Sequence, residues 1–406
     1  MKRVLFISGS IGLGHVNRDL AIASELSRQL PDVDITWLAS QPAKSVIKEA
    51  GGRFDPQIEN YGNDTTAAQK ASGGEMLNLY KYVMNAVLFS NEWRKNVDVL
   101  KQIIRKGDID LVIGDETYEI IIALLKKTLN LKIPFVIIYD FLGLDAMTRS
   151  PIEAIAVYMI NALWANDHKV IKRNRNLALF VGEPDDVLDR GFGPFLGKRR
   201  DHANKYYHFI GYILPFDPNE YTDIGQLRRR LGYGDGKLVI CSIGGVGVGK
   251  ELLEICSKAF PIIKERVPGL HMLLIGGPGT DISKLTAQPG MEVKQYVPAL
   301  YEHFAACDLA IVQAGGTTTL ELTALCRPFI YVPQENQCEQ NFTVCGRLER
   351  HRAGIRMNIR DMSPESLADT VTANLGKAVN YADVPVDGAK RAAKLISDVL
   401  RGFQQE

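Results

Sequence analysis

A glycine pair followed by hydroxylated residues and a glutamate is the feature of this sequence best suited to chemistry. The segment Gln313-Ala314-Gly315-Gly316-Thr317-Thr318-Thr319-Leu320-Glu321 follows an apolar, strand-like run. Glycines let a ligand approach the backbone, and a helix that begins there offers free N–H groups to an anionic phosphate. The threonines predict helix capping and free hydroxyls, and Glu321 can accept hydrogen bonds from ribose. The segment therefore predicts a nucleoside diphosphate site.

A polar loop after the next strand-like run extends this site. It runs Pro333-Gln-Glu-Asn-Gln-Cys-Glu-Gln340-Asn341. Sugar hydroxyls need paired donors and acceptors, which amide side chains supply. A capped helix beside a solvated polar loop, without any ligand, remains the competing interpretation.

A second glycine-rich turn, Gly9-Ser-Ile-Gly12-Leu-Gly14-His15, follows the first strand-like run. A dinucleotide site would need an acidic residue at the end of the second strand, where Leu38-Ala39-Ser40 stands. His15 is a candidate general base, although it could simply cap or pack the helix. Asp115 or Glu116, after the run 111–114, could orient His15, and Asp115 could equally cap the next helix.

The third turn, Ser242-Ile-Gly244-Gly245-Val-Gly247-Val-Gly249-Lys250-Glu251, matches the first part of a Walker A loop. The match fails at Glu251, because the magnesium-binding Ser or Thr is missing. A turn that admits a donor phosphate or an acceptor is the better prediction.

These turns lie in a chain that alternates strand-like and helical segments throughout. The predicted strands of the first half are 4–8, 35–39, 111–114, 135–139 and 177–181, and those of the second half are 238–242, 272–276, 292–295, 309–313 and 329–332. Runs nearly continuous in Val, Ile and Leu are typical of parallel strands covered on both faces. The sequence therefore predicts an α/β protein with two doubly wound sheets in tandem.

The helices predicted between the first strands are 15–30, 43–50, 76–105 and 119–129, and helices are expected from about 250, 300, 318 and 339. A Gly- and Pro-containing seam at 209–218 separates the halves, so the predicted domains are 1–212 and 213–385. A last helix, within 386–406, could pack back on the first domain.

The composition excludes several classes of protein. With 48 Lys and Arg against 47 Asp and Glu, the formal charge of +1 gives no basic excess for nucleic acid. No apolar run is long enough to span a bilayer. The six cysteines form no C-x-x-C pair and are expected to be buried and reduced, which favours a cytoplasmic protein.

These motifs, in this order, resemble the GT-B glycosyltransferases, and in particular the MurG-type enzymes of family 28. The resemblance covers nearly the whole chain and is most specific in the second half. It implies two Rossmann-like domains that face each other across a cleft, the first binding the acceptor and the second the nucleotide sugar.

The resemblance also assigns roles to residues. Gly12 and Gly14 match the acceptor-side loop that ends in His15. The donor would contact Gly244, Gly245, Gly247, Tyr296, Val297, Gly315, Gly316, Thr317, Thr318, Thr319, Glu321, Gln340 and Asn341. MurG itself has two glutamines where this chain has Gln340-Asn341, a slight departure.

By resemblance, the reaction is an inverting hexosyl transfer that needs neither metal nor cofactor. A UDP-sugar is the favoured donor, with His15 as base and Asp115 as its partner. Two Asp-x-Asp triplets, 32–34 and 108–110, precede strands and are interpreted as turns rather than metal sites. A nucleotide-sugar 2-epimerase and a non-catalytic nucleotide-sugar-binding protein are the alternatives.

Of the two substrates, the acceptor is the one that the sequence determines least. The apolar segment 152–164 and the basic cluster 198–200 suggest a hydrophobic or lipid-linked hydroxyl acceptor. The expectation is at most peripheral contact with the inner face of a membrane.

Overall fold

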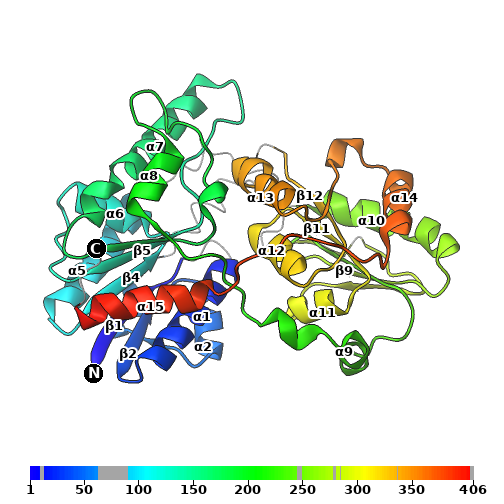
Figure 1. Ribbon diagram of the computed structural model, residues 1–406, viewed down its shortest axis with the longest axis horizontal. Coiled ribbons are helices and arrows are strands. Elements are labelled where there is room, and N and C mark those ends of the chain that lie inside the picture. Colours follow the sequence, from blue (N-terminus) through cyan, green and yellow to red (C-terminus); the bar gives the residue numbers. More distant parts are fainter. Residues whose placement is uncertain are drawn as a thin grey trace. The chain divides into compact units, whose positions relative to one another are not determined.

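The chain forms two compact units. The computed structural model describes residues 1–9, 13–62, 90–244, 249–277, 280–283, 285–335 and 337–402. Unit 1 contains the described residues up to Pro215 and those from Pro385 onward, and unit 2 spans Phe216–Val384 (Figure 1).

The core of unit 1 is a parallel sheet of seven strands within the described residues, in the order β3-β2-β1-β4-β5-β6-β7. The strands are β1 (Lys2–Ile7), β2 (Val33–Leu38), β3 (Arg53–Phe54), β4 (Leu111–Asp115), β5 (Phe135–Tyr139), β6 (Leu177–Phe180) and β7 (His208–Phe209). The chain runs outward from β1 in one direction and resumes at β4 in the other. This reversal places a switch point between β1 and β4, where ligands bind in doubly wound sheets.

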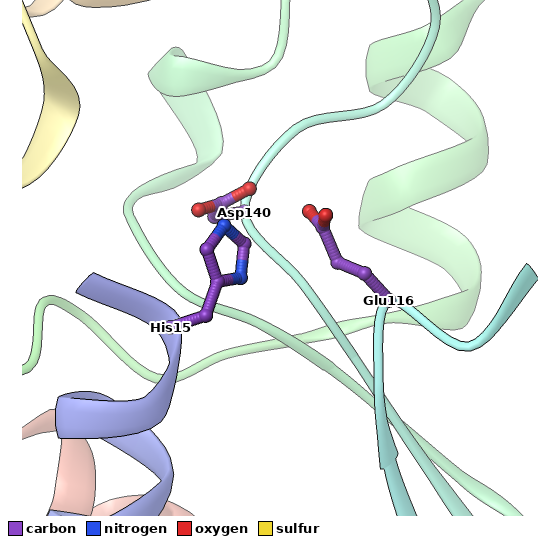
Figure 2. Close-up of side chains that lie close together, drawn as sticks. All are labelled: His15, Glu116 and Asp140. Atoms are coloured by element: carbon purple, nitrogen blue, oxygen red, sulfur yellow. The ribbon is translucent and has the colours of Figure 1, made fainter. Parts of the chain in front are cut away.

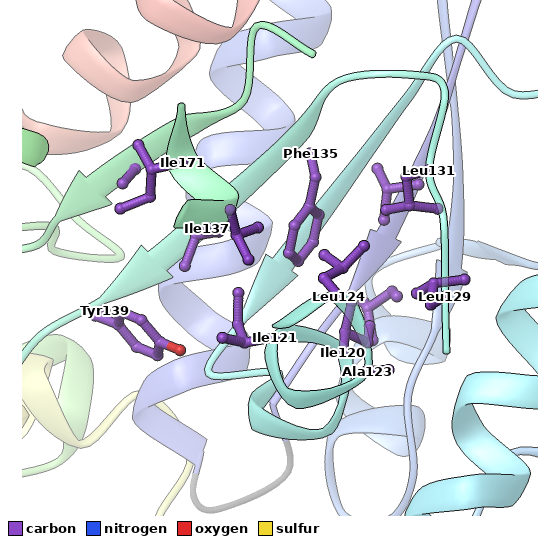
Figure 3. Close-up of a cluster of buried hydrophobic side chains, with 14 of the residues drawn as sticks. Ile120, Ile121, Ala123, Leu124, Leu129, Leu131, Phe135, Ile137, Tyr139 and Ile171 are labelled. Atoms are coloured by element: carbon purple, nitrogen blue, oxygen red, sulfur yellow. The ribbon is translucent and has the colours of Figure 1, made fainter. Parts of the chain in front are cut away.

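Helices cover both faces of this sheet. One face packs on α1 (Leu13–Gln29), α2 (Ala43–Glu49) and α15 (Gly388–Arg401). The other packs on α5 (Ser90–Arg105), α6 (Tyr118–Leu125), α7 (Pro151–Ile171) and α8 (Arg199–Tyr206), and Figure 3 shows the side chains of α6 against β5. Since Val4 and Leu5 lie in opposite clusters, every position of β1 from Val4 on must be apolar.

The last helix, α15, belongs to unit 1. It packs along α1 and contributes Ala392, Ala393 and Ile396 to the cluster on that face. Its start is fixed by the backbone N–H of Gly388, which donates to the carbonyl of Tyr212 at 2.9 Å.

Unit 2 repeats the architecture with six parallel strands in its described part, in the order β10-β9-β8-β11-β12-β13. They are β8 (Leu238–Ser242), β9 (His271–Ile275), β10 (Met291–Lys294), β11 (Leu309–Gln313), β12 (Phe329–Val332) and β13 (Ile355–Arg356). One face packs on α10 (Lys250–Arg266) and α14 (Pro364–Asn374), the other on α9 (Ile224–Leu231), α11 (Leu300–Ala306), α12 (Gly316–Ala324) and α13 (Cys345–Arg350). The switch point lies between β8 and β11.

Short irregular elements complete the two units. They are the 3₁₀ turns Pro56–Asn60, Pro184–Asp186, Pro218–Tyr221 and Ile359–Asp361 and a π-helix, Glu339–Val344. The helix expected from Glu339 thus starts as a π-turn, a form enriched at functional sites.

The predicted doubly wound α/β fold is confirmed, with three differences in detail. The two-residue edge strands β3, β7 and β13 are too short to show a period and were not predicted. Of the predicted helix 76–105, the described part is α5. The expectation of buried cysteines is wrong for Cys326, which is exposed, and for Cys338, which is half-buried.

Candidate active site

The switch point of unit 1 brings His15 and Asp115 together. His15 lies in the first turn of α1, and Asp115 is the last residue of β4. The His15 Nδ1 atom is 2.9 Å from Oδ2 of Asp115, which is fully buried. Asp115 does not cap the next helix, because Thr117 is the N-cap residue of α6. In the tautomer that carries its proton on Nδ1, His15 donates to Asp115 and offers Nε2 as the proton acceptor.

Arg18, one helical turn after His15, neutralises the carboxylates around it. Its Nη2 pairs with Asp115 and lies 2.8 Å from His15 Nδ1, and its Nη1 is 2.5 Å from Asp140 Oδ2. Burial opposes the charge, but Asp115 and Asp140 raise the pKa of Arg18 above its usual range. Burial also opposes ionisation of Asp140, yet Arg18 and then His15 hold the pKa of this carboxyl below its usual range.

Two further buried carboxyls in this cluster have raised pKa values. Burial, then the charges of Asp140 and Asp115, raise the pKa of Glu116 well above its usual range. Burial and the charge of Asp115 do the same to the pKa of Asp19, which accepts a hydrogen bond from Ser8 Oγ at 2.6 Å.

A metal ion fits this cluster poorly. His15, Glu116 and Asp140 offer possible ligand atoms within 4.8 Å of one another (Figure 2). A dication there would lie against the guanidinium of Arg18, which already pairs with Asp140. The Asp-x-Asp triplets lie at the opposite strand ends, where Asp108 and Asp34 form ion pairs with Arg3 and Arg53.

In unit 2, the N-terminus of α12 is free of side-chain caps. Gly315 is the N-cap residue, and it has no side chain with which to cap the first N–H groups of the helix. The prediction that threonines cap this helix is wrong. Thr319 is buried and its hydroxyl donates backward to the Gly315 carbonyl at 2.8 Å, whereas Thr317 is exposed and Thr318 half-buried. The uncapped N–H groups suit an anion.

Glu321, further along α12, is a buried carboxyl without a counter-charge. Its side chain is 9% exposed and makes no hydrogen bond or ion pair with any residue that the structure describes. Burial alone raises the pKa of Glu321 to about 8.

The amide side chains beyond β12 form a connected network. Gln340 Oε1 accepts from the backbone N–H of Gln334 at 2.8 Å, and Asn341 Nδ2 donates to the Gln334 carbonyl at 2.7 Å. Gln334 Nε2 donates in turn to Oε1 of Gln313, at the end of β11, at 3.1 Å. Each partner fixes which end of an amide faces the loop. Gln340 keeps its NH₂ for other contacts, and the Asn341 oxygen accepts from Arg356 Nη2 at 3.4 Å.

The remaining predicted residues are more scattered. Gly244 has φ +78°, and the side chain of Gln313 lies so close to Gly249 that no Cβ fits there. Tyr296 is exposed and Val297 buried, while Gly14 is half-buried in α1. Gly12, Gly245 and Gly247 lie outside the described residues.

Comparison with known proteins agrees with this architecture. The glycosyltransferase family 28 C-terminal domain matches residues 239–398. A UDP-N-acetylglucosamine--N-acetylmuramyl-(pentapeptide) pyrophosphoryl-undecaprenol N-acetylglucosamine transferase of Clostridioides difficile (strain 630) is 22% identical over 388 residues, covering 93% of this chain and 82% of the relative. An uncharacterised glycosyltransferase of Methanosarcina acetivorans is 23% identical and covers 84% and 81%.

Solved structures show the same fold. The glycosyltransferase of kitacinnamycin superposes with a TM-score of 0.62 at 17% identity, covering 98% of this chain and 95% of the other. The glycosyltransferase SnogD of Streptomyces nogalater gives 0.58 at 18% identity, covering 98% and 99%. The chain is a MurG-like glycosyltransferase of the GT-B fold with a family 28 C-terminal domain.

The site of this glycosyltransferase contains residues that sequence reasoning missed. Arg18 and Asp140 complete the charge cluster of unit 1, and Gln313 and Gln334 connect the turns of unit 2. Arg18 and Asp140 are 122 residues apart, so only the strand order brings them together. Among the described residues no helix is long and apolar enough to cross a membrane.

Proposed function

We propose that this glycosyltransferase transfers a hexose from a UDP-sugar to a hydroxyl of a hydrophobic, lipid-linked acceptor, with inversion and without a metal. The observation that carries the proposal is Glu321. A buried carboxyl without a hydrogen-bond donor is costly. It is explained if a ligand brings the donors, and the two ribose hydroxyls of a nucleotide are such donors beside an uncapped helix N-terminus.

The uridine in this proposal rests on the relatives. The Clostridioides difficile protein is named for a UDP-N-acetylglucosamine donor and a pyrophosphoryl-undecaprenol acceptor. By analogy, a UDP-sugar donor and a lipid-linked acceptor are proposed for this chain.

The chemistry needs one base and one anion-stabilising group. In an inverting transfer the acceptor oxygen attacks the anomeric carbon as the carbon–oxygen bond to the diphosphate breaks, and that bond's electrons leave with the diphosphate. His15 takes the hydroxyl proton, and Asp115 stabilises the imidazolium that forms. The N–H groups at the start of α12 stabilise the departing diphosphate. Since these groups supply both functions, activity is expected to persist in excess EDTA.

Nucleotide binding tests the proposal directly. Thermal unfolding is measured with UDP, dTDP, GDP, ATP and their sugar derivatives. UDP and UDP-sugars are expected to stabilise the wild type, and Glu321→Gln to weaken UDP binding about 10- to 100-fold, the loss of a charged hydrogen bond. Glu365→Gln, an exposed carboxyl of α14, is the matched control. Stabilisation by ATP and by no sugar nucleotide would contradict the proposal.

An exposed apolar surface supports the lipid-linked acceptor. Ile155 and Met159 on α7 are 62% and 55% exposed, and Phe195, in a neighbouring loop, is fully exposed. Tyr158 of α7 packs against Gly193, so helix and loop form one surface. Exposed Arg149 lies just before α7, and exposed Lys198, which pairs with Asp189 at 3.3 Å, follows Phe195 in the loop. Basic residues near such a surface suit an anionic bilayer. Phe195→Ser is expected to reduce co-sedimentation with phosphatidylglycerol vesicles, whereas Tyr296→Ser, an exposed aromatic of unit 2, is not.

A further inference from the structure

Glu116 is held in a backbone conformation that glutamate rarely adopts. It follows β4 directly and has φ +50°, in the left-handed region where side chains other than glycine are strained. Its backbone N–H donates to the Ile138 carbonyl of β5 at 3.1 Å, so the conformation is fixed by the sheet. Strain of this kind concentrates at functional sites, where the surrounding fold maintains it.

The side chain of Glu116 is buried, and no described residue donates a hydrogen bond to its Oε1 atom. It is 5% exposed, and Oε1 is enclosed without a partner among the described residues. The neighbouring Asp115 is occupied by His15 and Arg18. The carboxyl group beside Glu116 is that of Asp140, and two carboxyls form a hydrogen bond only if one of them is protonated.

The directions of the two pKa shifts favour Glu116 over Asp140 as the protonated partner. Burial and the charge of Asp140 raise the pKa of Glu116, while Arg18 lowers that of Asp140. Glu116 therefore donates its proton to Asp140 through one oxygen. Its other oxygen is a hydrogen-bond acceptor that no described residue fills.

We propose that this oxygen of Glu116 binds the acceptor substrate, by accepting a hydrogen bond from a hydroxyl or N–H group next to the attacking hydroxyl. The inference rests on the proposed function and deepens it. A ring nitrogen of His15 and an oxygen of Glu116 lie within 4.8 Å, a span that two neighbouring substituents of one molecule can bridge (Figure 2).

The chemistry of the attacking hydroxyl requires a second donor. That hydroxyl has one proton, which it gives to His15, so it cannot also donate to Glu116. The preferred acceptors are therefore vicinal diols or hydroxyls beside an amine or amide N–H.

Three variants and a matched pair of acceptors test this. Transfer from a UDP-hexose is measured with octane-1,2-diol and with octan-1-ol, for the wild type and for Glu116→Gln, Glu116→Leu and Glu116→Gly. The wild type is expected to prefer the diol about 10-fold in kcat/KM, the effect of one hydrogen bond. Gln reproduces a neutral carboxyl, with its NH₂ toward Asp140 and its oxygen toward substrate, and should keep this preference. Leu and Gly should lose it through a higher KM for the diol.

The glycine variant separates binding from structure. Glycine relieves the strain at φ +50°, so Glu116→Gly is expected to raise Tm by about 2–4 °C while losing the preference for the diol. A lower Tm with the preference retained would overturn the inference, because Glu116 would then serve the fold. Inactive Glu116→Gln would also overturn it, because an ionised carboxylate would then be required.

The wild type distinguishes the two proposals. Transfer to both alcohols without a preference for the diol overturns the inference and leaves the proposed function intact. A wild type that neither transfers from nor hydrolyses any UDP-sugar refutes the proposed function, and the inference with it.

Discussion

The two switch points of this glycosyltransferase differ in whether their buried carboxyl groups have a cationic partner. In unit 1, Asp115 and Asp140 are paired with Arg18, and the pKa values of Glu116 and Asp19 are raised. In unit 2, the buried Glu321 has no cation or donor among the described residues. In unit 1 the paired carboxylates share a cation, whereas the buried carboxyl of unit 2 has none among the described residues.

This difference indicates a different role for each site. Carboxylates that already share a cation are held in place before substrate arrives, and a general base needs neighbours fixed in this way. A buried carboxyl that lacks donors destabilises the free protein and gains most when a ligand supplies them. We therefore expect disruption of the unit 1 cluster to affect rate and stability, and changes in unit 2 to affect ligand affinity and its pH dependence.

Replacement of His15 should have the largest effect. His15→Gln removes the base and is expected to lower kcat by about 10²- to 10⁴-fold, the usual contribution of a positioned base. The affinity for UDP should change less than twofold, because the residues proposed to bind the donor lie in unit 2. Steady-state kinetics and calorimetric titration with UDP measure the two quantities. A loss of UDP affinity as large as the loss of rate would refute the division of roles.

Replacement of Arg18 should mainly reduce stability. Arg18→Met leaves Asp115 and Asp140 without their shared cation, and breaking a buried ion pair costs about 3–5 kcal/mol of unfolding free energy. Chemical denaturation measures it. Arg28→Met, on the same helix, breaks an exposed pair with Glu25 and is the control that should leave stability unchanged. Equal losses of unfolding free energy in the two variants would show that Arg18 does not stabilise the buried carboxylates.

Local signals explain how much of the fold the sequence predicts. Strands β4, β5, β8 and β11, and β1 from Val4 on, are buried on both faces, so their apolar runs are continuous and easily recognised. Glycine turns mark where helices begin. Since parallel strands end at one edge, the pairing of His15 with Asp115 also follows from element order.

Contacts that depend on packing explain what the sequence could not predict. Thr319 has the residue type of a cap, yet its hydroxyl bonds the carbonyl four residues back, an option open to any helical threonine. In the sequence, nothing distinguishes Arg18 from other polar helix residues. Only the fold brings the carboxylates at the ends of β4 and β5 next to it. Likewise, the burial that raises the pKa of Glu321 is a tertiary property.

The pH dependence of UDP binding sharpens the comparison. With its pKa at about 8, Glu321 is largely neutral in the free protein below that pH and must lose its proton to accept two ribose hydrogen bonds. UDP affinity should therefore rise from pH 6 to 8, by at most about tenfold per pH unit, with release of up to one proton. Titration calorimetry in buffers of different ionisation enthalpy measures both.

Glu321→Gln is the control for this pH dependence. It should bind UDP more weakly but with affinity almost independent of pH. The same raised pKa makes the free wild type less stable as pH rises from about 4.5 to 8, since the unfolded chain loses the proton first. If the UDP affinity of the wild type were as independent of pH as that of Glu321→Gln, a group other than Glu321 would accept the hydrogen bonds of the ribose hydroxyls.

The smallest effect is expected at Gln334, which tests whether the amide network of unit 2 positions the sugar. Gln334→Leu keeps the backbone bonds to Gln340 and Asn341 and removes only the hydrogen bond to Gln313. One neutral hydrogen bond contributes about 0.5–1.5 kcal/mol, so the donor KM should rise about 2- to 10-fold with kcat nearly unchanged.

Gln288→Leu is the matched control for Gln334→Leu. It removes a glutamine bond to the Ser257 carbonyl elsewhere in unit 2 and should leave the donor KM unchanged. If UDP affinity is unaltered in Gln334→Leu while the KM for the UDP-sugar rises, the network acts on the sugar and not on the nucleotide. If UDP and the UDP-sugar instead lost affinity equally, the network would act through Gln313 on the glycine turn at the start of α12, where the diphosphate is proposed to bind. In either case, the defect should be one of affinity, because the proposed base and its partners in unit 1 are held in place by their own ion pairs.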